Sequence, residues 1–447
     1  MSMSLRSDSG FTLIEVVIGV AIMAIMVAAI SQLFLVNLAS VTLGKARASG
    51  LGLANSQIEY IHSLPYLSVA TQNGAIYPAG NIADSQTVTQ DGQTFILKTD
   101  IRYIDDAYDG KAPADTNPAD YKRATVSVYL KTNNKLVSRL TTDIANKNES
   151  SMPNTGVLSL TVIGASGQAI PNANVTITNA TVAPAVNIST VADNYGVLSI
   201  PNLPIDSGND YQVIASLPGN STSGTIPEPA GAQTAVILNP NILNQQVTSL
   251  TLAIDKVSTM LVKVQDTAGA PIANSAITIT GAKKTMQTPD VYKYSAVSTS
   301  DATGSITLSN MEWDSYSFTP PSGYYVAAAS PYAPFALSPG IAQTVTLTLS
   351  NSSTWPRIAT VAPITASAIA GTMLSTITGA NLPTGTVVKL KKAGSADITA
   401  TLVVSSLSNT KLTMAFLLTG ATPGVWDIAV TNGSNTTTQI GGLIVTP

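Results

Sequence analysis

The 447-residue sequence contains no cysteine and only one histidine, His62. Without cysteine there can be no disulfides, thiolate metal sites, iron–sulfur clusters or cysteine nucleophiles. A single imidazole excludes zinc sites built from two or three histidines, and a Ser-His-Asp triad would have to use His62. The sequence has no GxSxG, HExxH or P-loop motif. A glycosidase with two carboxylates has no such motif, but Asp and Glu are sparse in the C-terminal two thirds. We therefore expect no enzymatic activity and no catalytic residue.

Charged residues are also scarce, at 11% of the chain, and 22 Lys and Arg nearly balance 25 Asp and Glu. This balance offers no basic surface for nucleic acid, so we expect no nucleic-acid partner. The length corresponds to about three domains of roughly 150 residues, which predicts several modules in series.

The longest uncharged run extends from Val16 to Gly44, between Glu15 and Lys45. A membrane-spanning helix needs about 20 apolar residues, whereas the apolar region of a cleaved signal peptide has about 7–15. A signal peptide would also need a basic N-terminal region, and here Arg6 is opposed by Asp8. We therefore expect a retained membrane helix. On composition alone, Glu15 would be solvated at the headgroup boundary, because a carboxylate deep in the bilayer costs about 2.5–3.5 kcal/mol.

The segment Gly10-Phe11-Thr12-Leu13-Ile14-Glu15-Val16 resembles the N-terminal signature of type IV pilins and pseudopilins. The resemblance implies that a prepilin peptidase cleaves between Gly10 and Phe11 and that the new amine of Phe11 is methylated. It further implies that Glu15 binds this amine of a neighbouring pilin subunit in a homo- or heteropolymer. The precursor would lie in the cytoplasmic membrane and the mature subunit in an extracellular filament at the cell surface. Unlike many family members, the leader has no basic residue directly before Gly10.

Beyond the membrane segment, Leu51, Ala54, Ile58 and Ile61 recur at helical spacing. This pattern predicts one helix from Phe11 to about Ser63, ended by Pro65. The stretch from 54 to 66 resembles the helix end of minor pilins of the PilV and GspI type. We expect His62 to contact the last carbonyls of the helix rather than to act as a base.

Two turn signals predict a small antiparallel sheet after the helix. Asp91-Gly92 and Asn133-Asn134 each lie between segments that alternate apolar and polar residues. We therefore expect two hairpins and about four strands in the head, up to about residue 150.

An acidic cluster lies between the two hairpins. Its members are Asp105, Asp106, Asp109, Asp115 and Asp120. Calcium takes six to eight oxygen ligands, and certain pseudopilins hold calcium in such a loop. Asp105, Asp106 and Asp109 are therefore candidate calcium ligands, and calcium is the one cofactor considered. The alternative is a solvated loop whose aspartates cap turns and pair with Lys111, Lys122 and Arg123.

From residue 151 onward, short runs of Val, Ile, Leu and Thr are separated by turn residues, as in β-proteins. The segment from Gly167 to Thr178 recurs 102 residues later, starting at Gly269. The segment from Asp193 to Ile200 recurs 108 residues later, starting at Asp301. This spacing predicts a duplicated β-sandwich. Both copies resemble carboxypeptidase-regulatory-like domains of the transthyretin type, which implies a spacer or binding module without peptidase activity.

The C-terminal segments 377–388 and 423–432 resemble an IPT/TIG immunoglobulin-like domain, in which we expect Trp426 to belong to the core. Late in the second repeat, aromatic residues either pack loops or form a patch for a surface glycan or protein ligand. These residues are Trp313, Tyr316, Tyr324, Tyr325 and Tyr332.

The predicted fold is therefore an α+β pilin-like module, with a long N-terminal helix and an antiparallel sheet, followed by three all-β immunoglobulin- or transthyretin-like sandwiches. The expected boundaries are 1–10 for the leader, 11–150 for the helix and head, and 151–252, 253–352 and 353–447 for the sandwiches. The leading functional hypothesis is a structural subunit, minor or at the tip of a pilus or pseudopilus, whose sandwiches serve adhesion or surface contact. The alternative is a membrane-tethered surface binding or scaffold protein that does not polymerise.

Overall fold

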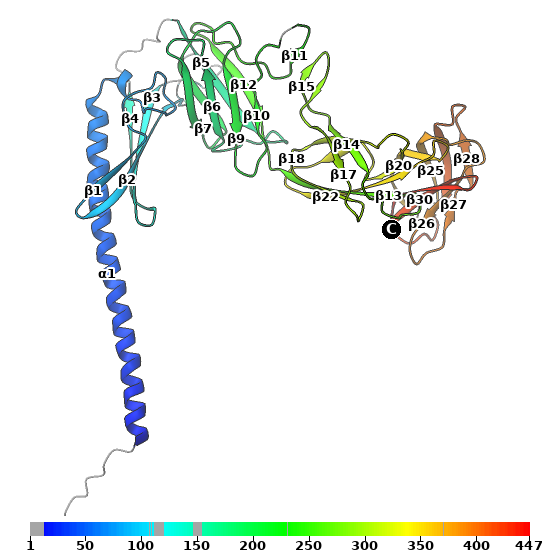
Figure 1. Ribbon diagram of the computed structural model, residues 1–447, viewed down its shortest axis with the longest axis horizontal. Helices are drawn as coiled ribbons and strands as arrows, with labels where there is room; N and C mark the ends of the chain where they lie inside the picture. The colour runs from blue at the N-terminus through cyan, green and yellow to red at the C-terminus, as the bar shows by residue number, and fades with distance from the viewer. Residues whose placement is uncertain are drawn as a thin grey trace, which may run out of the picture. The chain divides into compact units, whose positions relative to one another are not determined.

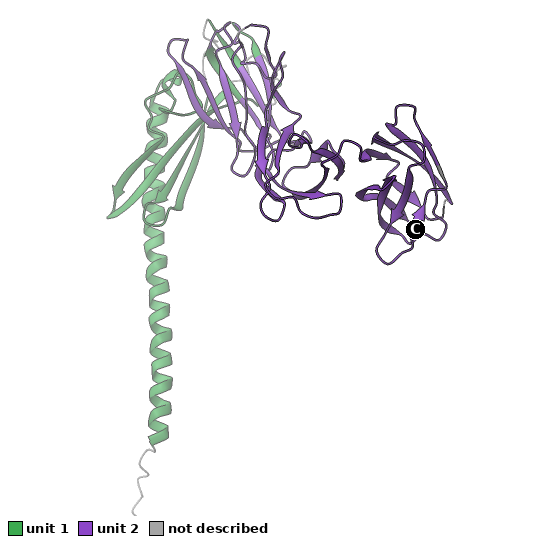
Figure 2. Cartoon of the chain, turned by 45° about the vertical axis from the view of Figure 1, so that its right-hand side comes forward, with its two compact units in different colours: residues 1–157, 199–203, 244–247 green, residues 158–198, 204–243, 248–447 purple. Residues whose placement is uncertain are grey.

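A computed structural model describes residues 13–106, 108, 110, 120–145, 154–229, 231–369 and 371–447. It contains one long N-terminal helix followed by many β-sheets, as expected (Figure 1). The chain divides into two compact units (Figure 2). The first comprises residues 1–157, 199–203 and 244–247, and the second contains the remaining residues.

Helix α1 runs from Leu13 to Ser63 without interruption. No proline occurs between Phe11 and Leu64, and the alanine, leucine and methionine residues have high helix propensity. At 1.5 Å per residue the helix is about 77 Å long. Pro65 then starts the short 3-10 helix η1, Tyr66–Ser68, so α1 ends where the sequence predicts.

The head is a four-stranded antiparallel sheet of order β1-β2-β3-β4 that packs against the C-terminal part of α1. Its strands are β1 Ser85–Gln90, β2 Gln93–Ile104, β3 Tyr121–Leu130 and β4 Lys135–Ala145. Asp91 and Gly92 both have positive φ, which suits the tight turn of the first hairpin. Alternating buried residues such as Phe95, Leu97 and Val126 pack against Ala54 and Ile61 of the helix.

The two repeats have the same sheet order. The first repeat has the sheets β10-β9-β6-β7 and β12-β5-β8. The second repeat has the corresponding sheets β21-β19-β14-β17 and β22-β13-β18, and β20 is an additional strand beside β22. The strands of the first are β5 Thr155–Ile163, β6 Asn174–Asn179, β7 Val186–Val191, β8 Val197–Pro204, β9 Gln212–Ser216, β10 Ser223–Gly224 and β12 Val247–Ala253. Those of the second are β13 Ser258–Asp266, β14 Ala276–Gly281, β17 Ser295–Thr299, β18 Ser305–Met311, β19 Asp314–Thr319, β20 Tyr325–Ser330, β21 Phe335–Leu337 and β22 Ala342–Ser350.

The repeated glycines make the same contacts in both copies. Gly196 and Gly304 have φ of 71° and 74°, and a Cβ on either would lie 2.5 Å from a backbone oxygen, that of Val162 or of Val264. The amides of these two valines donate to the carbonyls of the respective glycines at 2.7 Å. The repeated residues thus occupy equivalent turns.

A hairpin of the second repeat forms a small sheet with a strand from the first. Strand β11, Thr234–Ala235, pairs with β15, Lys284–Gln287, which in turn pairs with β16, Val291–Tyr292. The β11 segment therefore pairs outside the sheets of its own repeat.

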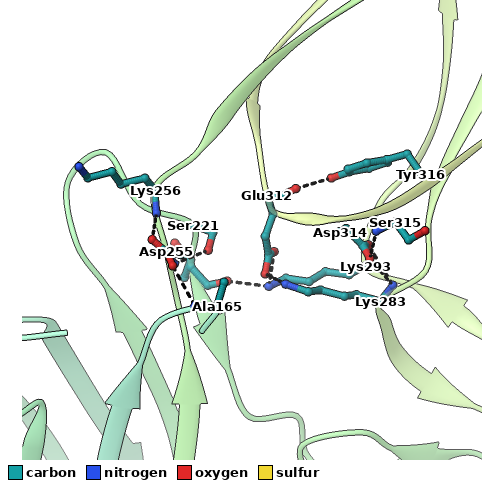
Figure 3. A network of polar contacts seen from close by, with 11 residues as sticks. Ala165, Ser221, Asp255, Lys256, Lys283, Lys293, Glu312, Asp314, Ser315 and Tyr316 are labelled. Carbon is teal, nitrogen blue, oxygen red and sulfur yellow. Dashed lines mark hydrogen bonds and ion pairs between the residues drawn. The ribbon is translucent and has the colours of Figure 1, made fainter. Parts of the chain in front are cut away.

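A polar network lies at the same junction (Figure 3). The carboxylate of Glu312 accepts from Lys283 at 2.7 Å and from Lys293 at 2.6 Å, and Lys293 also donates to the Thr222 carbonyl at 2.9 Å. Asp255, in the segment joining the repeats, accepts from the backbone amide of Ala165 at 2.8 Å. Strand pairing and these bonds together hold the two repeats at this junction.

The C-terminal sandwich contains the sheets β23-β25-β29-β28 and β24-β31-β30-β26-β27. Its strands are β23 Arg357–Ala362, β24 Thr365–Ser367, β25 Thr372–Ala380, β26 Val387–Lys391, β27 Ile398–Thr399, β28 Leu402–Ser405, β29 Lys411–Leu417, β30 Gly424–Asn432 and β31 Asn435–Thr446. Trp426 lies in the core and is 1% exposed, and its Nε1 donates to the Thr422 carbonyl at 3.0 Å.

Candidate functional site

The N-terminal half of α1 is an unusually large exposed apolar surface. Every residue from Leu13 to Thr42 is exposed, and Figure 1 shows strands beside the C-terminal part of the helix only. The helix is long and apolar enough to cross a membrane. The exposed length is about 45 Å, against about 30 Å of hydrocarbon in a typical bilayer. Such a surface requires lipid or other apolar helices around it.

Three polar side chains in this half donate hydrogen bonds to the backbone of the same helix. Ser31 donates to the Val27 carbonyl at 2.8 Å, Asn37 to Leu33 at 3.0 Å, and Thr42 to Leu38 at 2.8 Å. Each bond joins a residue to the carbonyl four positions earlier. The hydroxyl donors of Ser31 and Thr42 are thus satisfied inside the helix, whereas the Asn37 amide uses one of its two N–H groups in this way.

Glu15 lies in the first turn of α1 and is exposed. A carboxylate in this turn interacts favourably with the helix dipole. Gly10 and Phe11, the predicted cleavage residues, lie outside the described residues. The structure therefore places Glu15 near the N-terminal end of the apolar surface, and the processing residues remain predictions from the sequence.

Small residues allow α1 to lie close against the sheet of the head. A Cβ on Gly50 would come 2.8 Å from Cγ2 of Val137 in β4. Ala46 and Ala54 on the same helix are fully buried. Ser49 donates to the carboxylate of Asp91 in the β1–β2 turn at 2.6 Å. The helix is thus attached to the head along one narrow face of small side chains.

Lys122 is a buried cation that bonds to backbone carbonyls, whereas the sequence suggested that it pairs with the loop aspartates. Its ammonium donates to the carbonyls of Tyr66 at 2.8 Å and Val69 at 2.9 Å. It lies 4.6 Å from the ring centroid of Tyr66 and 5.3 Å from that of Tyr103. Burial lowers the pKa of Lys122 to about 8. This side chain ties the segment after α1 to strand β3.

The acidic loop is described in part. Asp120 accepts from the amide of Asp106 at 2.7 Å, and Asp106 accepts from the amide of Tyr108 at 2.8 Å, as expected of aspartates that stabilise turns. Arg123 pairs with Asp143 of β4 at 2.7 Å. Within the described part of the chain, no three acidic or histidine side chains are grouped to hold a metal ion. Asp109 lies outside the described residues, so calcium binding at Asp105, Asp106 and Asp109 stays a prediction.

The single histidine and the aromatic residues have structural contacts. The Nε2 of His62 lies 2.8 Å from Oγ1 of Thr142 in β4, rather than against the helix carbonyls. Tyr316 is buried, and its hydroxyl donates to the Glu312 carbonyl at 2.8 Å. The ammonium of Lys283 lies 3.1 Å from the centroid of the Trp313 ring. Tyr332 packs against the C-terminal core. Trp313, Tyr316 and Tyr332 therefore each have contacts within the protein, and these contacts lie in more than one domain.

Residues 5–31 match the family described as "Prokaryotic N-terminal methylation motif". The chain carries a type IV pilin-like N-terminus. This match covers the predicted leader and the first part of α1, whereas no curated protein matches the chain.

Solved structures give only distant likenesses. The TIE protein of Bacillus anthracis is 14% identical with a TM-score of 0.17, covering 82% of this chain and 73% of that one. The shaft pilin SpaA of Lactobacillus rhamnosus GG is 15% identical with a TM-score of 0.17, covering 44% and 98%. A streptococcal ancillary pilin is 12% identical with a TM-score of 0.21, covering 59% and 80%. At these values the likenesses support no conclusion about this chain.

Proposed function

We propose that the protein is a structural subunit of a type IV pilus or pseudopilus, in a minor or tip position. The observation that carries the proposal is the continuity of the methylation motif, residues 5–31, with a helix whose residues from Leu13 to Thr42 are all exposed. A prepilin peptidase requires the motif for cleavage, and a filament core built of helices requires an exposed apolar helix. Neither feature alone distinguishes a subunit from a simple membrane anchor.

In this proposal a prepilin peptidase cuts between Gly10 and Phe11, and the amine of Phe11 is methylated. Glu15 then pairs with that amine of a neighbouring subunit. In an apolar layer, a carboxylate gains much from a cation that also donates hydrogen bonds, so this pair would fix the register between subunits. The exposed helix leaves the bilayer and packs with other pilin helices, with no enzymatic step by this protein.

The β-sandwiches would project from the filament and serve adhesion or surface contact with a glycan or protein. We propose that the first two are transthyretin-like and the third immunoglobulin-like. The sheet order shared by the first two sandwiches and the β11–β15 pairing between them support the use of these two domains as a stiff spacer.

The direct test is to shear filaments from the native cells and determine the N-terminal residue and intact mass of this protein in the filament and membrane fractions. A chain starting at Phe11 in sheared material is expected. A chain that starts at Met1 and is confined to the membrane would instead establish the tethered binding protein that does not polymerise.

Glu15→Leu separates the same two functions genetically. In an assembling subunit it should leave membrane retention intact and lower incorporation into filaments, whereas in a tether it should have no effect. Glu59→Leu is the matched control, because Glu59 is an exposed carboxylate on the same helix beyond the apolar segment. Equal loss with both variants would contradict a specific role for Glu15.

A further inference from the structure

A cavity of about 640 Å³ lies between the second and third sandwiches. Its apolar lining on the side of the second sandwich includes Phe318, Val326 and Leu347. The two sandwiches are joined beside it by a buried hydrogen bond of 2.7 Å from Nε2 of Gln439 to the Ala329 carbonyl. A volume of this order suits a small molecule, since ligand pockets measure about 300–1,000 Å³.

The opposite wall is the outer face of the sheet β23-β25-β29. Arg357 pairs with Ala380 and Thr378 with Lys411, so these four side chains project from the same face. Ile377, which directly precedes Thr378, points the other way and is fully buried in the core. Arg357 and Lys411 both line the cavity, which therefore has two cations on one wall.

These cations lack acidic partners. The sequence has no Asp or Glu between Asp314 and Asp397, and the ion pairs found among the described residues include neither Arg357 nor Lys411. The Nε of Arg357 is buried without a hydrogen-bond acceptor. Its guanidinium lies 5.2 Å from the Tyr325 ring centroid, and this aromatic contact helps to orient the planar guanidinium group. The Nε–H has almost no accessible surface, so an anion in the cavity would bind the terminal N–H groups of the guanidinium and supply the missing counter-charge.

We propose that this cavity binds a small carboxylic acid with a hydrocarbon body. Arg357 pairs with the planar carboxylate, Lys411 adds positive charge, and Phe318 and Val326 contact the hydrocarbon. The guanidinium fork matches carboxylate geometry, and the apolar wall disfavours a fully hydrophilic anion. This site is independent of whether the chain assembles into filaments.

The test is equilibrium dialysis of the full chain in a detergent with a neutral headgroup, with detergent alone as the blank. The probe is 4-phenylbutyrate, and 4-phenylbutan-1-ol is its uncharged counterpart. The wild type should retain the acid above the blank and the alcohol far less. Arg357→Gln should weaken binding of the acid about tenfold or more, since a charge-assisted bond is lost. Lys391→Gln removes the same charge from an exposed position on β26, outside the cavity lining, and should have no effect.

Ala380→Leu tests the cavity without removing charge, because the larger side chain fills the wall beside Arg357. It should abolish retention of the acid. The proposal is overturned if the wild type retains no acid above the blank, if acid and alcohol bind equally, or if Arg357→Gln and Ala380→Leu both bind like the wild type. If Arg357→Gln does not fold, as judged by circular dichroism, the acid–alcohol comparison and Ala380→Leu decide.

Discussion

The ammonium of Lys122 lies over the ring of Tyr66 and donates to the carbonyl of that same residue, at 2.8 Å. One side chain thus fixes both the main chain and the aromatic ring directly after α1. Since Lys122 is 1% exposed, water cannot replace it as a donor.

Replacing Lys122 by methionine should loosen this segment. The carbonyls of Tyr66 and Val69 would lose a buried donor, at a cost of about 1–3 kcal/mol. Hydrogen exchange of the amides of residues 66–70 should accelerate about tenfold or more. Lys131→Met, at an exposed position of the β3–β4 turn, is the control and should leave these amides unchanged. Equal protection in both variants would refute the structural role of Lys122.

The same lysine predicts a pH dependence. Burial lowers the pKa of Lys122 from 10.5 to about 8, so between these values the unfolded state binds more protons. The free energy of unfolding of the wild type should therefore rise relative to Lys122→Met as the pH goes from about 8 to 9.5. This range lies below the ordinary pKa of tyrosine, about 10. A difference that stays constant or falls across this range would contradict the buried cation.

Glu312 holds the junction of the two repeats through Lys283 and Lys293, and its side chain is only 15% exposed. Glu312→Gln would remove the carboxylate that the two ammonium groups share and leave Asp314 near Lys283 alone. Exchange of amides in the β15–β16 hairpin should accelerate about tenfold. Asp290→Asn breaks the more exposed pair with Lys284 and should change the exchange of these amides little. If the two variants behave alike, the Glu312 network contributes little to the junction.

Substitutions of Gly304 and Gly269 distinguish destabilisation by a steric clash from destabilisation by an unfavourable backbone conformation. Both have positive φ, but a Cβ would lie 2.5 Å from the Val264 oxygen at Gly304 and would meet nothing within 4 Å at Gly269. Gly269→Ala should cost about 1–2 kcal/mol for the left-handed backbone alone. Gly304→Ala should lower the stability of the domain clearly more than Gly269→Ala does. Hydrogen exchange of the β13 amides measures both losses. A smaller effect at Gly304 would contradict the described contact.

Gly50 and Gly52 make a similar pair on α1. Nothing lies within 4 Å of a Cβ on Gly52, so Gly52→Ala should stabilise the helix by about 0.5–1 kcal/mol. Gly50→Ala places its methyl group 2.8 Å from Val137 of β4. The clash should outweigh the gain in helix stability and weaken the packing of α1 on the sheet. Exchange of α1 amides near residue 54 reports both. Stabilisation by Gly50→Ala would mean that helix and sheet are further apart than described.

Local signals in the sequence identified much of the fold. Pro65 ends α1, Asp91-Gly92 forms a tight hairpin turn, and Trp426 is buried. Each of these outcomes depends on a residue type whose backbone or burial preference is strong by itself. The exposed apolar half of α1 follows from a run that is too long for a buried helix of a small head.

The contacts that sequence reasoning missed join distant segments. Lys122 binds carbonyls 56 and 53 residues earlier, and backbone acceptors carry no sequence signature. The cavity beside Arg357 depends on how two sandwiches meet, although the absence of carboxylates between Asp314 and Asp397 was a visible signal.

The pairing of β11 with β15 also bears on how the repeats diverged. The repeat offset grows from 102 at Gly269 to 108 at Asp301, and the β15–β16 hairpin lies between these two positions. Among the described residues this hairpin occurs in the second copy only, and it pairs with strand β11 of the preceding copy. The six residues by which the second copy is longer here therefore account for the strand that links the tandem domains. A third copy placed after the second would need its own insertion to be held in the same way.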